Sequence, residues 1–279
     1  MALRPTVLRR TAPRVAGYAG WTAAVAVVAI ELECDVAMGP LAHSLLGIAL
    51  GMLLVFRTNA AYDRYWEGRG RWSQIVATAR NLMRGWSTSV VGPPKPAFVP
   101  LVPAYVSAVG SRLRGVDLAS IDGARLRPHE LCALAGAQRS TVALARRMSW
   151  HIRASVREGG LSDASASTLE GFVAELTQHE AACERIAGSP MPTAYLNQIR
   201  HLLTAYIATL PFALVGQIGW LVVPATVVIA FGLIGIQEAG SEIENPFGED
   251  DNDLPLDEYC AAVRSDARAF LGAPGRRAF

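Results

Sequence analysis

The sequence predicts an all-α membrane protein, and three observations lead to that prediction. Charged residues make up 18% of the 279 residues, against about 25% in a typical soluble domain. Three long apolar stretches contain no formal charge: Val15 to Ile30, Val36 to Phe56 and His201 to Gln237. No segment of useful length alternates apolar and polar residues as a half-buried strand does. Helices long enough to cross a bilayer are therefore the expected elements.

The first apolar stretch, Val15 to Ile30, is preceded by four arginines and followed by three acidic residues within residues 31–35. Its sixteen residues are fewer than the about 20 that a spanning helix needs, and Leu32 extends it past Glu31. A cleaved signal peptide with a basic start is the alternative interpretation. Because acidic residues follow instead of a clean small-residue cleavage site, we expect a first transmembrane helix.

The second stretch, Val36 to Phe56, continues without a break into a helical pattern beyond the apolar residues. Neither Pro nor Gly interrupts the chain from Phe56 to Gly68, and the pattern can be followed to about Trp86. This predicts one helix that crosses the membrane and extends into the cytosol.

The third stretch is 37 residues long, which is too long for one span at about 1.5 Å per residue. Glycines and prolines interrupt it, and we expect a helical hairpin that turns near Gly216–Gly219. Residues 1–14 carry four arginines, residues 57–200 have a net charge of +7, and residues 31–35 are acidic. Positive charge favours the cytoplasmic side, so four spans in the cell membrane with both termini cytoplasmic are predicted.

The predicted spans divide the chain into four parts. These are residues 1–56 with the first two spans, a cytosolic helical region 57–200, the hairpin 201–237 and a cytosolic segment 238–279. Within the second part, the proline-rich segment from Gly92 through Pro103 is expected to be a loop. Helices are expected over residues 104–115, 128–157 and 165–187.

Several function classes are disfavoured by composition and motifs. The formal charge of +2 and the single lysine, Lys95, argue against a nucleic-acid-binding surface. Catalytic nucleophile, phosphate-binding and zinc motifs are absent from the sequence, so we do not expect an enzyme or a required cofactor. The four cysteines lie far apart and are expected to be small apolar core residues.

The order and spacing of several motifs resemble the bestrophin family, in its prokaryotic branch. The residues that carry the resemblance are Leu46–Ile48 with Phe56–Arg69, Pro192–Tyr195, Leu210–Val215, Ile243–Gly248 and Asn252–Asp257. The resemblance covers nearly the whole chain. It implies a homopentameric channel in the lipid bilayer, with chloride or another anion as the permeant ion and the second helix of each subunit lining one axial pore. Some prokaryotic relatives prefer cations, so a cation channel of the same architecture is an alternative.

By position in the motif, the hydrophobic neck of the pore would be formed by Ile48, Met52 and Phe56. Their spacing of four residues places them on one helical stripe, although a lipid-facing helix shows the same spacing. A second, cytosolic aperture maps to Ala164, while Ser162 and Asp163 are also suited to cap the helix that follows.

Animal relatives hold calcium in the segment that corresponds to residues 245–253. Asn245, Asp250 and Asp253 match the ligand positions, with Glu242 near another. Oxygen-rich clusters suit calcium, whereas acidic residues before a helix start are also ordinary capping residues. Both interpretations stay open.

Two further features have alternative interpretations. The arginines that follow the neck are Arg57, Arg64, Arg69 and Arg71. They either raise the anion concentration in a vestibule, or they hold neighbouring subunits or pair with Asp63 and Glu67, the latter four residues before Arg71. Gly47 and Gly51 form a GxxxG pattern that either allows close helix approach or only thins the helix near the axis. A membrane-anchored scaffold or sensor without transport is the alternative function class.

Overall fold

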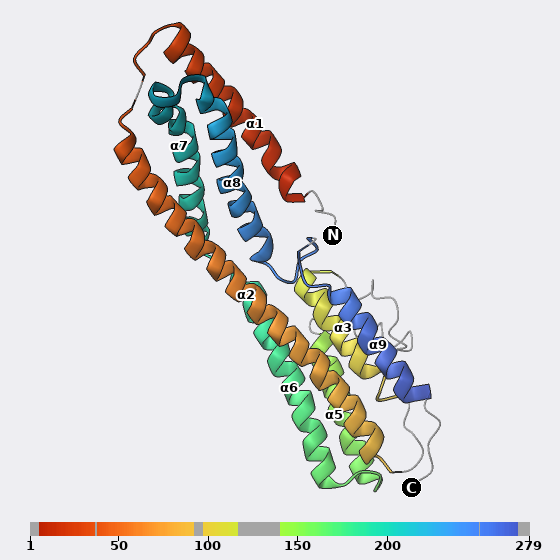
Figure 1. Ribbon diagram of the computed structural model, residues 1–279. Coiled ribbons are helices and arrows are strands. Elements are labelled where there is room, and N and C mark those ends of the chain that lie inside the picture. Colours follow the sequence, from red (N-terminus) through yellow and green to blue (C-terminus); the bar gives the residue numbers. More distant parts are fainter. Residues whose placement is uncertain (1–5, 37, 92–96, 117–139, 251, 273–279) are drawn as a thin grey trace. The chain divides into compact units, whose positions relative to one another are not determined.

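The computed structural model describes residues 6–36, 38–91, 97–116, 140–250 and 252–272. Every regular element in these ranges is helical (Figure 1), which confirms the predicted all-α fold class. The chain forms two compact units: one comprises residues 1–65, 190–245 and 250–252, and the other comprises residues 66–189, 246–249 and 253–279.

The first unit contains α1 (Thr6–Ala26), the first part of α2 (Pro40–Ser89), α7 (Thr193–Ile218) and α8 (Val222–Ile243). Helix α1 packs along α8 and α7. It begins well before the uncharged stretch and ends in a π-helical turn, Val27–Glu31. The apolar helix Leu8–Glu31 therefore has 24 residues, enough to cross a bilayer.

The hairpin predicted in the third stretch is present. Helices α7 and α8 pack on each other and are joined by a 3₁₀ turn, Gly219–Leu221. Gly219 has a φ of +53°, a left-handed conformation that glycine adopts without steric cost. Within the described part of the chain, three stretches are long and apolar enough to span a membrane: Leu8–Glu31, Pro40–Ser89 and Thr193–Ile243. The last of these contains both arms of the hairpin.

A cluster of aliphatic side chains holds the first unit together. Leu50 and Leu54 of α2 pack with residues of the other three helices, namely Val15, Ile199, Leu203, Ile207, Ala230 and Ile234. Close packing matters here because lipid offers no hydrophobic driving force between helices. The cluster therefore fixes which face of α2 points into its own subunit.

The second unit contains the remainder of α2 together with α3 (Leu101–Arg114), α5 (Ser140–Arg157), α6 (Asp163–Gly188) and α9 (Leu256–Gly272). Helix α3 packs against α5, α6 and α9. Large aromatic side chains fill its core, and Trp86 stacks on Phe98 with ring centroids 3.8 Å apart. This unit has the buried aromatic core of an ordinary soluble helical domain.

The loop expected from Gly92 through Pro103 ends earlier than predicted. Helix α3 begins at Leu101 and includes Pro103. The N–H groups of a first helical turn have no intrahelical partner, so proline is tolerated there. The helix expected from residue 128 is described from Ser140 onward, and residues 117–139 lie outside the described part.

The expected helix over 165–187 is observed as α6, with Ser162 as its N-cap. The hydroxyl oxygen of Ser162 accepts a hydrogen bond from the Ser165 N–H at 3.2 Å, which confirms the predicted capping. Cys183 and Cys260 are buried as expected, but Cys34 is exposed. Cys34 follows the end of the π-helical turn, and Cys132 is outside the described residues.

Candidate pore-lining site

Helix α2 has one exposed and one buried apolar face within the first unit. Ile48, Met52 and Phe56 are 65%, 55% and 58% exposed in the single protomer. Leu50 and Leu54, which point the other way, are 1% and 3% exposed. The helix thus leaves an apolar stripe uncovered while its opposite face packs into the subunit. We call Ile48, Met52 and Phe56 the neck residues.

The exposed stripe extends beyond the neck residues in both directions. Leu41 and Leu45 precede them at helical spacing and are 74% and 61% exposed. Asn59 and Asp63 follow on the same side of the helix, and both are exposed. The first polar groups that continue the stripe after Phe56 are therefore an amide and a carboxylate, not a guanidinium.

Arg57 lies on the buried face and is 5% exposed. Its guanidinium donates hydrogen bonds to the Gln237 carbonyl oxygen at 3.1 Å and to the Ser241 hydroxyl at 2.6 Å. The Glu244 carboxylate lies 4.0 Å away. A buried arginine with these partners ties α2 to the end of α8 and is not placed to attract ions along the stripe.

Arg64 has a similar structural role, because its Nε donates to the Glu244 carbonyl oxygen at 3.2 Å. The predicted Glu67–Arg71 pair is wrong. Glu67 forms its ion pair with Arg185 of α6, and Arg71 donates to the side chain of Gln74. A partner from another helix thus replaces Arg71 at Glu67, and Arg71 takes an i, i+3 partner on its own helix. An i, i+4 pair contributes only about 0.2–0.5 kcal/mol.

The two glycines of the GxxxG pattern differ in their surroundings. A Cβ atom at Gly47 would lie 2.8 Å from the Tyr206 hydroxyl, whereas nothing lies within 4 Å of a Cβ at Gly51. The Tyr206 ring also lies on His43, with centroids 4.3 Å apart. Gly47 therefore permits close approach of α7 to α2, and Gly51 does not serve this purpose within the subunit.

Ala164 is exposed in the first turn of α6. Its carbonyl oxygen accepts a hydrogen bond from the Thr168 hydroxyl at 3.1 Å. The position carries a small, uncovered side chain in the second unit.

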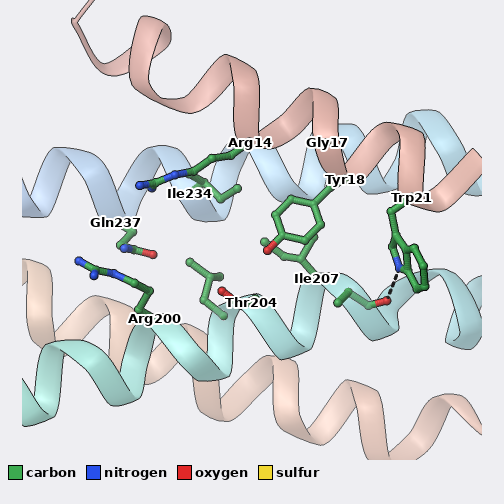
Figure 2. Close-up of a pocket in the computed structure, with 11 residues that line it drawn as sticks. Arg14, Gly17, Tyr18, Trp21, Arg200, Thr204, Ile207, Ile234 and Gln237 are labelled. Atoms are coloured by element: carbon green, nitrogen blue, oxygen red, sulfur yellow. Dashed lines mark hydrogen bonds between the residues drawn. The ribbon is translucent and has the colours of Figure 1, made fainter.

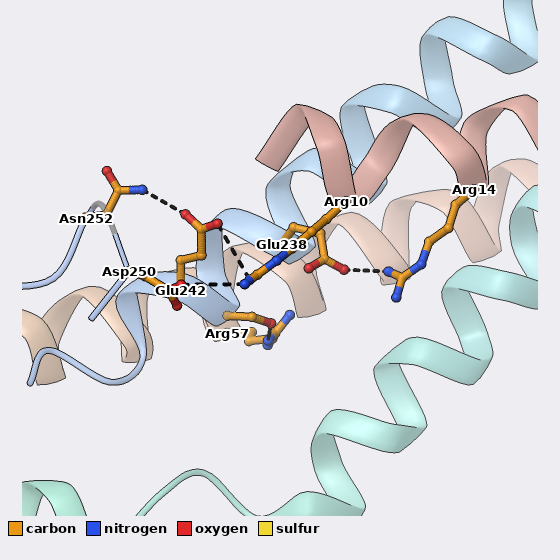
Figure 3. Close-up of polar contacts among 8 residues, drawn as sticks. Arg10, Arg14, Arg57, Glu238, Glu242, Asp250 and Asn252 are labelled. Atoms are coloured by element: carbon orange, nitrogen blue, oxygen red, sulfur yellow. Dashed lines mark hydrogen bonds and ion pairs between the residues drawn. The ribbon is translucent and has the colours of Figure 1, made fainter. Parts of the chain in front are cut away.

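Polar contacts join α1 to the end of α8 and to the acidic segment that follows it (Figure 3). Arg10 lies 3.8 Å from Oε1 of Glu242 and 3.5 Å from Oδ1 of Asp250. Oε2 of Glu242, whose side chain is 1% exposed, accepts a hydrogen bond from Asn252 at 2.8 Å. One helical turn away, Arg14 pairs with Glu238.

The three residues matched to calcium ligands are divided between the two units. Asn245 and Asp250 belong to the first unit, and Asp253 belongs to the second. Among the described residues, no group of three or more His, Cys, Asp or Glu side chains is placed to hold a metal ion. In the first unit, the cation beside Asp250 and Glu242 is the guanidinium of Arg10.

Two features of this region were missed by sequence reasoning. Asp63 was treated as an arginine partner, although its spacing from Phe56 on an unbroken helix already placed it on the stripe. The contact of Arg10 with Glu242 joins residues 232 positions apart. No local signal in the sequence indicates such a pair.

Comparison with known proteins identifies the family. The family model described as bacterial and fungal bestrophin protein matches residues 1–269. The protein belongs to the bestrophin family. Among the relatives, a voltage-dependent anion channel-forming protein of Mesorhizobium japonicum is 34% identical over 282 residues, covering 97% of this chain and 88% of the relative. A protein of the same name from Synechocystis is 34% identical over 233 residues, covering 81% and 76%.

Solved structures agree with this assignment at the level of the fold. A bestrophin homologue from Klebsiella pneumoniae superposes with a TM-score of 0.85 at 24% identity, covering 93% of this chain and 97% of the homologue. The family assignment confirms the resemblance seen in the sequence and the membrane character of this bestrophin. Because the curated relatives are named as channels, the assignment also confirms the expectation that the protein is not an enzyme.

Proposed function

We propose that this bestrophin is a homopentameric channel in the cell membrane, that it conducts chloride and similar anions, and that α2 of each subunit lines a central pore. The observation that carries the proposal is the unbroken exposed stripe from Leu41 to Phe56 on a helix whose opposite face is buried in its own subunit. The names of the relatives support the choice of anions. Charge patterning supports placing both termini in the cytoplasm.

The neck residues account for a gate in this arrangement. Five copies of Ile48, Met52 and Phe56 form three stacked apolar rings, and a narrow apolar tube conducts poorly when it loses its water. The positive edges of the Phe56 rings compensate a passing anion. Met52 is unbranched and flexible, so the width of the middle ring adjusts by rotation of its side chain.

Ala164 supplies the cytosolic aperture in this proposal. Its side chain is small and exposed at the start of a capped helix. A ring of five alanines is wider and less selective than a ring of larger aliphatic residues, so selectivity is assigned to the neck and the residues that follow it.

A cation-selective channel is the second candidate, and Asp63 is the observation that favours it. This carboxylate is exposed on the stripe, two helical turns beyond Phe56. Rings of acidic side chains favour cations. Arg57 and Arg64, the first arginines on either side of it in the sequence, are engaged with the end of α8.

The acidic segment after α8 serves a structural role in this proposal. Arg10 pairs with both Glu242 and Asp250 and thereby joins α1 to α8. Calorimetric titration of the purified protein with Ca²⁺ is expected to show no binding heat. Binding that disappears in Asp250→Asn would instead establish a calcium site.

Flux from proteoliposomes that contain only this protein tests the function. Vesicles loaded with chloride and a chloride-sensitive dye are expected to release chloride when a gradient is applied. A protein of the scaffold class would give no flux above that of empty vesicles. Crosslinking of the same preparation should stop at a pentamer.

A further inference from the structure

The first unit contains a cavity of about 460 Å³ between α1, α7 and α8. Figure 2 shows that its polar side chains gather at one end, where Arg14 of α1, Arg200 of α7 and Gln237 of α8 lie together. Tyr18 lies midway, and Trp21 lies at the other end. The remaining lining is mainly aliphatic, including Ile207 and Ile234.

The polar end carries donors that its own subunit leaves unused. Arg14 pairs with Glu238, but a guanidinium has five N–H groups. Arg200 makes no hydrogen bond or ion pair with the described residues. With Glu238 included, this end has a net charge of +1.

Gln237 is an independent indication of a ligand. It is 6% exposed, and its side-chain amide points into the cavity without a hydrogen-bond partner among the described residues (Figure 2). Its amide atoms line the open cavity, so a bound acceptor at this end can take hydrogen bonds from the amide N–H groups.

The other end is suited to a hydrocarbon chain. Trp21 donates its indole N–H to the Ala208 carbonyl oxygen at 2.9 Å, so the polar edge of the indole is satisfied and its apolar surface faces the cavity. Trp21 is also 47% exposed, and the cavity lies along two of the helices long enough to span a membrane. A molecule can therefore enter from the surrounding bilayer.

We propose that this cavity binds an anionic phospholipid. The phosphate accepts hydrogen bonds from Arg14, Arg200 and Gln237, and one acyl chain lies along Ile207 and Ile234 toward Trp21. Two guanidinium groups from different helices recognise a phosphate strongly, and the apolar end distinguishes a lipid from a soluble anion. Lipid binding at this site requires membrane insertion but not conduction. A failure of the proposed channel activity would therefore leave the lipid site untouched, and the reverse also holds.

Quenching of Trp21 by brominated acyl chains tests this site. In a Trp220→Phe background, Trp21 is the remaining tryptophan of the first unit. The same protein with Trp21→Phe in addition gives the fluorescence of the other tryptophans, which is subtracted. The protein is reconstituted in phosphatidylcholine vesicles that contain brominated phosphatidylglycerol or an equal fraction of brominated phosphatidylcholine. Phosphatidylglycerol is expected to quench Trp21 at a lower mole fraction than phosphatidylcholine does.

Arg200→Gln is expected to weaken phosphatidylglycerol binding about fivefold, the effect of one arginine near an anionic lipid. Arg9→Gln is the matched control, because Arg9 is exposed at the same end of α1 and does not line the cavity. If Arg200→Gln does not fold, Gln237→Leu takes its place. Equal quenching by the two lipids, or equal effects of Arg200→Gln and Arg9→Gln, would overturn the proposal. Displacement by soluble glycerol phosphate would overturn the assignment to a lipid.

Discussion

Individual side chains on α2 set the chemistry of the exposed stripe that we propose lines the pore. The arginine that follows Phe56 points into its own subunit and is bound there by Gln237 and Ser241. Asp63, by contrast, continues the stripe. The proposed anion conduction therefore rests on the apolar neck, with Asp63 acting against it.

Phe56→Ala is expected to increase conductance and to weaken discrimination among ions, because it removes the largest of the neck side chains and widens its ring. Single-channel recording in planar bilayers measures both effects. Val228→Ala is the matched control, since Val228 is a 71% exposed apolar residue of α8. Equal effects of the two substitutions would show that α2 does not line the pore.

Asp63→Asn is expected to move the reversal potential in a salt gradient toward the chloride equilibrium potential. It removes a ring of negative charge that attracts cations. Glu258→Gln removes an exposed acid of α9 and should leave the reversal potential unchanged. A shift toward the cation potential in Asp63→Asn would contradict the placement of this residue in the pore.

The buried thiol of Cys183 makes the second unit sensitive to alkaline pH. Burial raises the pKa of Cys183 from 9.0 to about 12. Above pH 9 the unfolded thiol ionises while the folded one stays protonated, so stability falls by up to about 1.4 kcal/mol per pH unit.

Melting temperatures between pH 8 and pH 10.5 measure this loss. Cys183→Ala should lose less stability over that range than the unchanged protein, and part of the loss remains because burial also raises the pKa of Cys260. Cys34→Ala, at an exposed position, should behave like the unchanged protein. A Cys183→Ala profile with the original slope would assign the loss to other groups.

Whole helices were predictable where local patterns define them. The continuation of α2 beyond the apolar stretch followed from the lack of Pro and Gly between Phe56 and Gly68, and the hairpin followed from glycines inside a long apolar stretch. The start of α1 and the inclusion of Pro103 in α3 were not predicted, because helix ends depend on tertiary packing and on the unpaired first-turn N–H groups. The partners of Glu67 and Arg10 depend on neighbouring helices, so the sequence left them open.

Gly68 tests how closely the second unit packs around α2. A Cβ at this position would lie 2.8 Å from the Pro246 ring and 3.1 Å from the Phe247 ring. Gly68→Ala is therefore expected to destabilise the unit by about 1–3 kcal/mol through overpacking. Gly70→Ala is the control, because nothing lies within 4 Å of its Cβ and alanine favours the helix by about 1 kcal/mol. Denaturant unfolding should give Gly70→Ala a larger free energy of unfolding than Gly68→Ala. The reverse order would contradict the close packing at Gly68.

For the whole molecule, the family assignment and the exposed stripe both support the proposed channel lined by α2. A single protomer leaves a long apolar stripe of α2 uncovered. In the proposed channel, five copies around an axis would cover this stripe and enclose water. From the sequence, the pore-lining role of α2 could be predicted only through the family motifs, because a lipid-facing stripe and a pore-facing stripe have the same spacing. The sign of the permeant ion depends on the summed electric field of all subunits.

The reversal potential of the purified protein in a planar bilayer tests whether this bestrophin conducts anions. A tenfold potassium chloride gradient separates the chloride and potassium equilibrium potentials, which lie about 59 mV on either side of zero. The account predicts a current that reverses close to the chloride value. A reversal close to the potassium value, or a bilayer without current, would contradict it.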